Sequence, residues 1–256
     1  MGLTFCVLAS GSKGNCTYVA AGESAVLIDC GLSARQVMLR LEARGLPAHR
    51  IKAIIITHEH GDHVRGLRVL AKRLGAPAMA TEATWAAARD TAAVRYQAVA
   101  AGRAFQVDGL RIHPFTVPHD AADPLGLVVS AGSARLGVAT DLGKATPLVR
   151  QRLAGCGALI LEHNHDPGML ANGPYQPWLK QRVRSAQGHL SNQEGAELLA
   201  ELRHPGLRQV VLAHISQVNN TPQLAARAAG QALQELGAAV RLAAAAQDQP
   251  GEVFEL

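Results

Sequence analysis

The sequence predicts an α/β protein in which two β-sheets pack together and helices cover their outer faces. Apolar runs of strand length follow one another along most of the chain, with helix-like segments between them and βα units towards the end. Of the 256 residues, 48% are apolar, which suits one large core or two half-domains that share a core. No stretch resembles a flexible linker between independent domains.

The first part of the chain predicts antiparallel strands followed by a helix. Short turns separate the first predicted strands, which favours antiparallel pairing; these strands are residues 3–9, 16–20 and 25–28. Ser33 can cap a helix that runs to Arg44 and stops at Gly45. The run 51–57 is β-branched and apolar, so it is predicted to be a buried strand.

Helix caps and turn residues predict the helices and strands that follow residue 57. Apolar residues at helical spacing predict a helix from Val64 to Leu74 with Gly75 as its stop, and Thr81 can cap a short helix over 82–89. Asp108-Gly109 is a hairpin signal. Later strands are predicted at residues 105–107, 110–117, 125–130, 135–140, 158–161, 208–213 and 238–243.

Two capped helices are predicted near the end of the chain. Ser191 and Glu194 form a capping box for a helix to about Leu202. Thr221, followed by proline, can cap a long helix that runs to Leu236 and stops at Gly237. The segment 168–177 is rich in glycine, proline and polar residues and is predicted to be a loop.

The densest group of metal-ligand residues lies between the strand 51–57 and the helix that follows it. His58, His60, Asp62 and His63 fall within one short turn at the carboxyl end of a strand, where open α/β sheets place their ligands. Imidazole and carboxylate groups suit Zn, Mn or Fe. Because no thiolate is among them, a closed structural zinc site is not expected. An ordinary polar loop between a strand and a helix does not require four potential metal ligands within six residues, so the sequence predicts a metal site.

The order H-x-H-x-D-H resembles the central motif of the metallo-β-lactamase superfamily. The resemblance implies an αββα sandwich, with residues 1–256 as a single domain and a metal site at one edge. It also implies further ligands in the order His, Asp, His. His119, Asp141 and His214 stand at predicted strand ends in that order.

By this resemblance, two divalent metal ions, Zn or Mn, share the site. One ion is assigned to His58, His60 and His119, the other to Asp62, His63 and His214, and Asp141 bridges them. Asp62 is also expected to act in catalysis. Asp29, at the end of another strand, is expected to support the metal-binding loop without binding metal itself.

A closer resemblance covers nearly the whole chain. Segments similar to the YycJ/WalJ-type branch, which is related to RNase Z, are residues 8–12, 15–16, 164–166, 188–192, 214–216 and 219–220. This implies a 5′-to-3′ DNA exonuclease, with RNA as a further candidate substrate. The sequence shows no counterpart of the RNase Z exosite arm and no room for a β-CASP insertion, which counts against pre-tRNA processing.

His189 matches a histidine that RNase Z-type enzymes use beside the metals, so it is predicted to be catalytic, as a proton donor or a phosphate clamp. The alternative is a histidine that only packs against its loop. The turn 10–15 could hold a phosphate on its N–H groups, although an ordinary hairpin turn is the reading that the sequence alone favours. The residues assigned to substrate binding are Ser10, Ser12, Asn15, Lys180, Arg182, Ser216 and Asn219.

Three alternatives remain open at this stage. His163, His165 and Asp166 form a second polar cluster whose spacing does not complete a metal set, so they are interpreted as loop or supporting residues. An enzyme of this fold could instead hydrolyse a small molecule: a lactone, a thioester or a cyclic phosphodiester. A metal-binding regulatory protein is the non-enzymatic alternative.

Composition is compatible with a nucleic-acid substrate. The net charge of +5 suits a polyanionic partner but does not require one. The sequence lacks an apolar stretch of transmembrane length and the basic start of a signal peptide, so no membrane interaction is expected. Its four cysteines form no C-x-x-C pair, which favours reduced, mostly buried thiols in a cytoplasmic protein.

Overall fold

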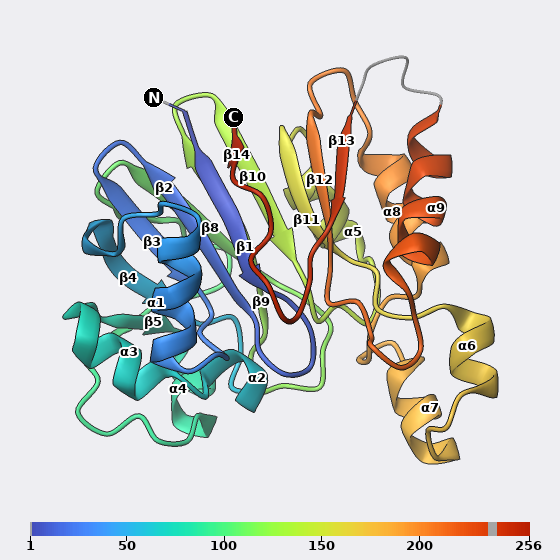
Figure 1. Ribbon diagram of the computed structural model, residues 1–256, viewed down its shortest axis with the longest axis horizontal. Helices are drawn as coiled ribbons and strands as arrows, with labels where there is room; N and C mark the ends of the chain where they lie inside the picture. The colour runs from blue at the N-terminus through green and yellow to red at the C-terminus, as the bar shows by residue number, and fades with distance from the viewer. Residues whose placement is uncertain (1, 235–239) are drawn as a thin grey trace.

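Two seven-stranded sheets form the centre of the computed structural model, which describes residues 2–234 and 240–256 (Figure 1). Sheet A has the order β14 (Phe254–Glu255), β1 (Thr4–Ala9), β2 (Cys16–Ala21), β3 (Ser24–Ile28), β4 (Ile51–Ile55), β5 (Ala78–Ala80) and β6 (Tyr96–Ala98). Sheet B has the order β13 (Arg241–Ala244), β12 (Gln209–Ala213), β11 (Ala158–Glu162), β10 (Ala134–Ala139), β9 (Leu125–Ala131), β8 (Leu110–Thr116) and β7 (Phe105–Val107).

The two sheets share one pairing pattern. In sheet A the pairs from β14 to β3 are antiparallel and those from β3 to β6 are parallel. In sheet B the pairs from β7 to β10 are antiparallel and those from β10 to β13 are parallel. The predicted antiparallel start is therefore confirmed. So is the hairpin at Asp108, whose φ of 49° is typical of such a turn.

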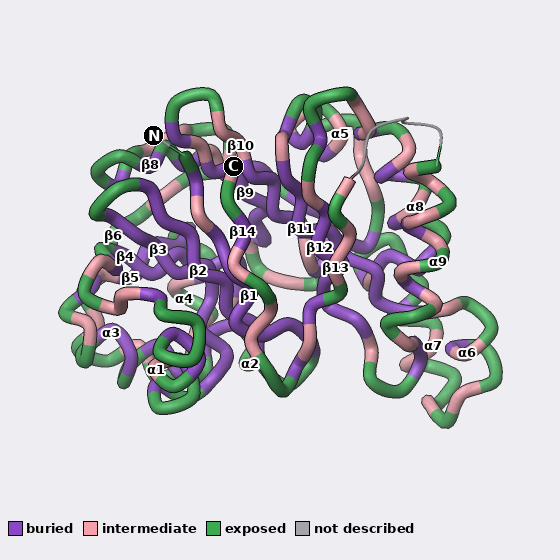
Figure 2. The backbone as a smooth tube through the Cα atoms, turned by 45° about the horizontal axis from the view of Figure 1, so that its top comes forward, coloured by how far each residue is buried: buried purple, intermediate pink, exposed green. Residues whose placement is uncertain are grey.

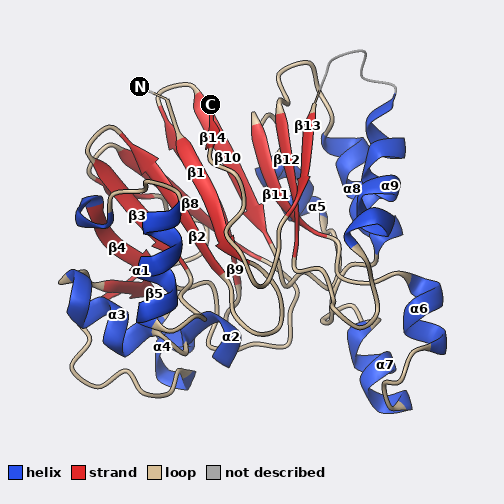
Figure 3. Ribbon diagram, in the orientation of Figure 1, coloured by secondary structure: helices blue, strands red, loops and turns tan. Residues whose placement is uncertain are grey.

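Helices lie on the outer faces of both sheets (Figure 3). Sheet A is covered by α1 (Ala34–Ala43) and α3 (Leu67–Leu74), and sheet B by α5 (Pro147–Leu153), α8 (Asn192–Leu202) and α9 (Pro222–Leu233). The shorter helices are α2 (Gly61–Val64), α4 (Glu82–Ala87), α6 (Pro167–Asn172), α7 (Pro177–Val183) and the 3₁₀ helix Ala48–Arg50.

The core has three apolar layers. Phe5 of sheet A and Ile112 of sheet B belong to the layer between the sheets. Leu41 of α1 belongs to the layer outside sheet A, and Leu198 of α8 to the layer outside sheet B. This is the αββα sandwich that the resemblance implied. All four cysteines are free and buried. Among the described residues, no helix has the length and apolar character needed to cross a membrane.

Side-chain caps start the helices where the sequence predicted them. The hydroxyls of Ser33, Thr81 and Thr221 each accept a hydrogen bond from a first-turn N–H group. Ser191 and Glu194 form both hydrogen bonds of the capping box of α8.

Two predicted elements were wrong. The single helix from Val64 to Leu74 is two helices, because the Gly66 N–H group donates to the Cys30 carbonyl oxygen at 2.9 Å and not to the preceding turn. A β-carbon at Gly66 would lie 1.9 Å from the Leu32 carbonyl oxygen, so the position requires glycine. The predicted loop 168–177 contains most of α6, which starts because the Asp166 carboxylate caps it and proline occupies its first turn. The predicted helix end at Leu236 and Gly237 and the strand start at Ala238 lie outside the described residues.

Candidate metal centre

The candidate site lies where strands of both sheets end. Each of its main residues follows or terminates a strand at the carboxyl end: Asp29 after β3, His58 after β4, His119 after β8, Asp141 after β10, Glu162 at the end of β11 and His214 after β12. Helix α2 then carries Asp62 and His63. Because both sheets supply residues, the site joins the two halves of the sandwich.

Three strand-end residues adopt left-handed backbone. The φ angles are 61° at Asp29, 54° at Asp141 and 54° at His214. This conformation costs a non-glycine residue about 1–2 kcal/mol. The side-chain contacts described below hold these residues in place against that cost.

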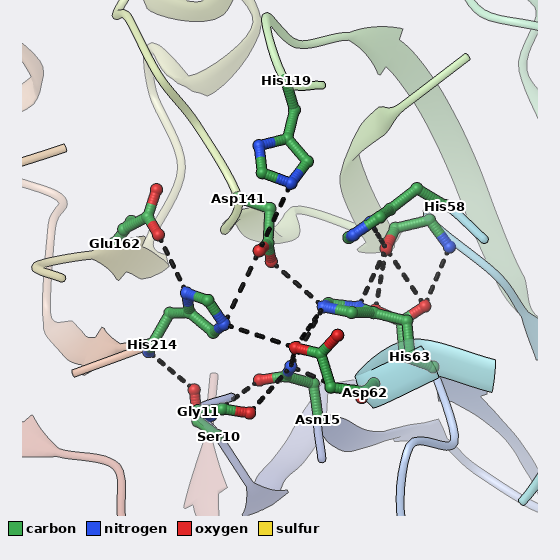
Figure 4. Close-up of polar contacts among 12 residues, drawn as sticks. Ser10, Gly11, Asn15, His58, Asp62, His63, His119, Asp141, Glu162 and His214 are labelled. Carbon is green, nitrogen blue, oxygen red and sulfur yellow. Dashed lines mark hydrogen bonds and ion pairs between the residues drawn. The ribbon is translucent and has the colours of Figure 1, made fainter. Parts of the chain in front are cut away.

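Figure 4 shows Asp141 at the middle of the site, with His119, His63 and His214 around it. The potential ligand atoms of His58, His60 and His119 all lie within 4.8 Å of one another, as do those of Asp62, His63 and His214. Asp141 Oδ2 is 3.2 Å from His63 Nε2, and Asp141 Oδ1 is 3.6 Å from His214 Nε2 and 3.8 Å from His119 Nε2. The structure thus brings together all seven residues that the resemblance assigned to metal.

The Nδ1 atoms of four histidines face acceptors. Nε2 is left without a hydrogen-bond partner in three of these rings, whereas His63 Nε2 lies 3.0 Å from Asn15 Nδ2. His63 Nδ1 is 2.8 Å from Asp29 Oδ2, and His119 Nδ1 is 3.1 Å from the Gly188 carbonyl. His214 Nδ1 is 3.0 Å from Glu162 Oε1, and His58 Nδ1 is 3.1 Å from Thr57 Oγ1. Metal-binding histidines use such contacts to fix the ring and its tautomer.

Buried atoms without hydrogen-bond partners provide a test of fit. Nε2 of His58, His119 and His214 and Oδ2 of Asp141 are all buried, and none forms a hydrogen bond, because the 3.2 Å contact between Asp141 Oδ2 and His63 Nε2 is an ion pair only. Buried polar groups are normally satisfied, and these four are grouped at one place. Divalent cations would satisfy them, so the residues present fit a metal site.

The electrostatics favour ligand forms at the centre. Burial, reinforced by His63, holds the pKa of His58 well below its ordinary value, and burial lowers the pKa of His119. Burial opposes the charge of Asp141, but His214 and His63 outweigh it and hold the pKa of Asp141 well below its usual range. Neutral imidazoles and an ionised carboxylate are the forms that bind cations.

The pKa values of His63 and His214 indicate that the centre has a negative electrostatic potential. Burial would lower the pKa of each ring, but Asp141 and neighbouring carboxylates outweigh burial and raise both pKa values well above normal. A field that attracts protons to these rings also attracts a cation.

Glu162 is a site residue that the sequence analysis missed. It is fully buried; its Oε1 accepts hydrogen bonds from His189 Nδ1 at 2.8 Å and His214 Nδ1 at 3.0 Å. Burial opposes its charge, but His189 and His214 outweigh burial and lower the pKa of Glu162 to about 2. The sequence contained a signal for it, because Glu162 directly follows the predicted buried strand 158–161 and begins a polar run that extends to residue 166.

His189 lies beside the predicted ligands. Its ring centroid is 5.2 Å from that of His119 and 5.0 Å from that of His214, and its side chain is 19% exposed. A ring that is oriented by a buried carboxylate and still reaches solvent can act on a bound substrate.

Residues around the ligands support them. Asp29 accepts hydrogen bonds from the Thr57 N–H group and from His63, as its predicted supporting role requires. Ser10 and Asn15, assigned to substrate, are buried instead: Ser10 Oγ accepts from the His214 N–H group at 2.7 Å, and Asn15 Nδ2 donates to Asp62 Oδ2 at 3.2 Å. These contacts connect Ser10 and Asn15 to the predicted ligands His214 and Asp62.

The other residues assigned to substrate differ in position. Ser12 is exposed. Lys180 Nζ donates to the Ala171 carbonyl, and Arg182 Nε donates to Asp120 Oδ2 at 2.6 Å. Ser216 Oγ accepts from the Asn219 N–H group, and Asn219 is only 1% exposed, so this pair shapes a turn.

The second polar cluster has contacts of its own. His163 is buried, its ring lies against the position of Gly195, and burial lowers its pKa to about 4. His165 is buried beside Ser191, with which its backbone forms a β-bridge. Asp166 caps α6. None of the metal-ligand groups found among the described residues includes these three.

Comparisons with known proteins agree with this geometry. Residues 24–215 match the family model described as a beta-lactamase superfamily domain. The chain is 34% identical to "Exodeoxyribonuclease YycJ" of Bacillus anthracis, covering 100% of this chain and 95% of that protein. It is 31% identical to "Exodeoxyribonuclease WalJ" of Streptococcus pneumoniae, covering 88% and 86%. The crystal structure of the metallo-beta-lactamase fold protein YhfI from Bacillus subtilis matches over 100% of both chains with a TM-score of 0.76 and 16% identity, a likeness of fold alone.

Proposed function

Because the chain belongs to the beta-lactamase superfamily and, within it, to the family of the exodeoxyribonucleases YycJ and WalJ, we propose that it is a metal-dependent exonuclease that degrades DNA from the 5′ end. One observation carries the proposal: two ligand groups meet at Asp141, with the His189–Glu162 pair directly beside them. Adjacent cation sites with a histidine at their edge suit the cleavage of a phosphodiester.

In the proposed centre, His58, His60 and His119 hold one divalent ion, Asp62, His63 and His214 hold a second, and Asp141 serves both. The imidazole-rich donor set suits Zn²⁺ or Mn²⁺. When bound, the ions would supply charge neutralisation at the phosphate and activation of the attacking water.

Side chains of the protein would then donate and accept the protons of the reaction. Glu162 accepts the His189 Nδ1–H group, so Nε2 is the atom that can give a proton to the leaving alkoxide oxygen. Asn15 holds Asp62 through Oδ2, which leaves Oδ1 to accept a proton from the attacking water. Asp62 is 20% exposed, so solvent reaches it.

The test compares substrates on one metal-loaded preparation. Single- and double-stranded DNA with the label at the 5′ or the 3′ end, RNA, bis-p-nitrophenyl phosphate and a lactone are each incubated with Mn²⁺ or Zn²⁺. We expect the 5′ label to be released at once in small products, while 3′-labelled DNA shortens progressively. Lactone hydrolysis faster than DNA cleavage by orders of magnitude would support the small-molecule alternative and reject the nuclease.

A further inference from the structure

Helix α7 extends away from the two sheets and carries an exposed tryptophan. In Figure 1 α6 and α7 extend from the sandwich at the lower edge, the same edge at which α2 lies. Trp178, in the first turn of α7, is 66% exposed, more than any other large apolar side chain of the described residues. Figure 2 shows that the surrounding backbone is also largely exposed or half-buried.

This exposure is specific to Trp178. The other tryptophan, Trp85, stacks on Tyr96 with ring centroids 4.4 Å apart and planes 9° from parallel. Trp85 therefore has a structural partner within the fold. An indole ring is a large apolar surface, and leaving it in water is unfavourable unless a partner covers it.

The exposed face of α7 is connected to the metal centre. Arg182 lies four residues after Trp178, on the same face of the helix. Arg182 Nε donates to Asp120 Oδ2 at 2.6 Å, and Asp120 Oδ1 lies 3.4 Å from His119 Nε2. These two contacts place the Arg182 part of α7 beside the predicted metal ligand His119.

The charge of this segment fits a polyanion. Residues 167–184 contain Lys180, Arg182 and Arg184 and no acidic residue. Proteins that bind single-stranded nucleic acid combine such cations, which follow the phosphates, with aromatic rings on which bases stack. Here one ring and three cations occur within eight residues.

We propose that Trp178 stacks on a nucleobase of single-stranded DNA whose backbone leads to the metal centre. The inference rests on the proposed function and adds to it a base-contacting residue. Because every base has a π-face, the contact selects unpaired nucleotides and not a sequence.

The test is a binding measurement with a phosphorothioate-linked oligodeoxythymidylate on the metal-loaded protein. In a Trp85→Phe background, Trp178 is the single tryptophan, and its fluorescence should be quenched as the DNA is added. Trp178→Ala should bind on the order of 10- to 100-fold more weakly, and Trp178→Phe should recover most of the affinity. Val69→Ala removes an apolar side chain that is 58% exposed on α3 and should bind as the wild type does.

The outcomes separate this inference from the nuclease proposal. If the unmodified protein cleaves no DNA, the proposed function fails, whatever the fluorescence shows. If it cleaves DNA but Trp178→Ala binds DNA like the wild type, this inference is wrong, and the surface serves another partner. The ratio of DNA cleavage to bis-p-nitrophenyl phosphate cleavage should fall in Trp178→Ala. An equal loss on both substrates, or a loss of bound metal, would make Trp178 a structural residue and overturn the inference.

Discussion

Asp141 has contacts on both sides of the proposed centre, so it is the residue at which the two ligand groups depend on each other. It is 3% exposed and faces His63, His119 and His214. A carboxylate has two oxygens and can serve two cations, whereas each imidazole ring offers one nitrogen to one cation.

Asp141→Ala should therefore lose nearly all bound metal, because both ligand groups lose the residue that they share. His58→Ala should mainly empty one of the two positions. Elemental analysis measures the metal content of both variants, which are purified without a histidine tag and then reloaded with metal. The dinuclear assignment fails if the unmodified protein never exceeds one ion per chain.

The His189–Glu162 pair gives a second prediction at this scale. His189→Ala should keep its metal and its melting temperature but lose roughly 100-fold or more in DNA cleavage, the usual effect of a general acid. The loss should be smaller on bis-p-nitrophenyl phosphate, whose leaving group needs little protonation. Glu162→Gln should also lower DNA cleavage, but it should weaken metal binding as well, because Glu162 accepts from both His189 and His214.

His49→Ala is the matched control, since His49 is exposed on the 3₁₀ helix. Equal losses on both substrates would remove the proton-donor role and leave phosphate binding. A loss of metal in proportion to activity would make His189 a ligand.

The loop after β3 packs against the turn that carries the central motif. A β-carbon on Gly31 would lie 1.6 Å from the Asp62 carbonyl oxygen, so only glycine allows this close approach. The Asn15 N–H group donates to the same carbonyl at 2.7 Å. The position of Asp62 therefore depends on backbone packing between elements.

Gly31→Ala should destabilise the fold by about 1–3 kcal/mol or more, as overpacking does, and should weaken metal binding by displacing α2. Gly230→Ala is the control: in α9 its β-carbon meets nothing within 4 Å, and alanine should be neutral or stabilise by up to about 1 kcal/mol. Urea unfolding with metal titration measures both. Unchanged metal affinity in Gly31→Ala would show that the turn is set by other contacts.

Elements with strong local signals were predicted well. Some elements depend on residues that are close together in the sequence, so a local pattern can predict them. Examples are the cap formed by Ser191 with Glu194 and the β-branched strand predicted at 51–57. The ligands could be found because the resemblance supplied their order. Helix α5 was missed although Thr146 caps it, and the buried roles of Ser10 and Asn15 depend on contacts between distant segments that no local pattern reveals.

At the scale of the molecule, the centre connects the two sheets. Sheet A positions His58, His60, Asp62 and His63 through β4 and α2, while sheet B positions His119, Asp141 and His214. A ligand that binds this arrangement binds the folded chain and not the unfolded one, so it stabilises the whole sandwich.

Chelation should therefore lower the melting temperature of the whole protein in one transition. Free metal at about 1,000 times its dissociation constant stabilises a fold by about 4 kcal/mol. Calorimetry with and without EDTA, followed by reloading with Mn²⁺ or Zn²⁺, measures the shift. A chelator that strips the metal but leaves the melting temperature unchanged would contradict a centre that spans both sheets.

The left-handed backbone at Asp29, Asp141 and His214 creates a conflict between the stability of the fold and metal-dependent activity. Glycine adopts these φ angles without steric cost, but it has no side chain with which to bind or orient a metal. In chelated protein, Asp141→Gly should be more stable than Asp141→Ala by about 1 kcal/mol. A library randomised at position 141 and sorted only for folding should enrich glycine, while one sorted for nuclease activity should return aspartate. Enrichment of alanine over glycine in the folding sort would show that the backbone there can relax, and that the centre imposes no such conflict.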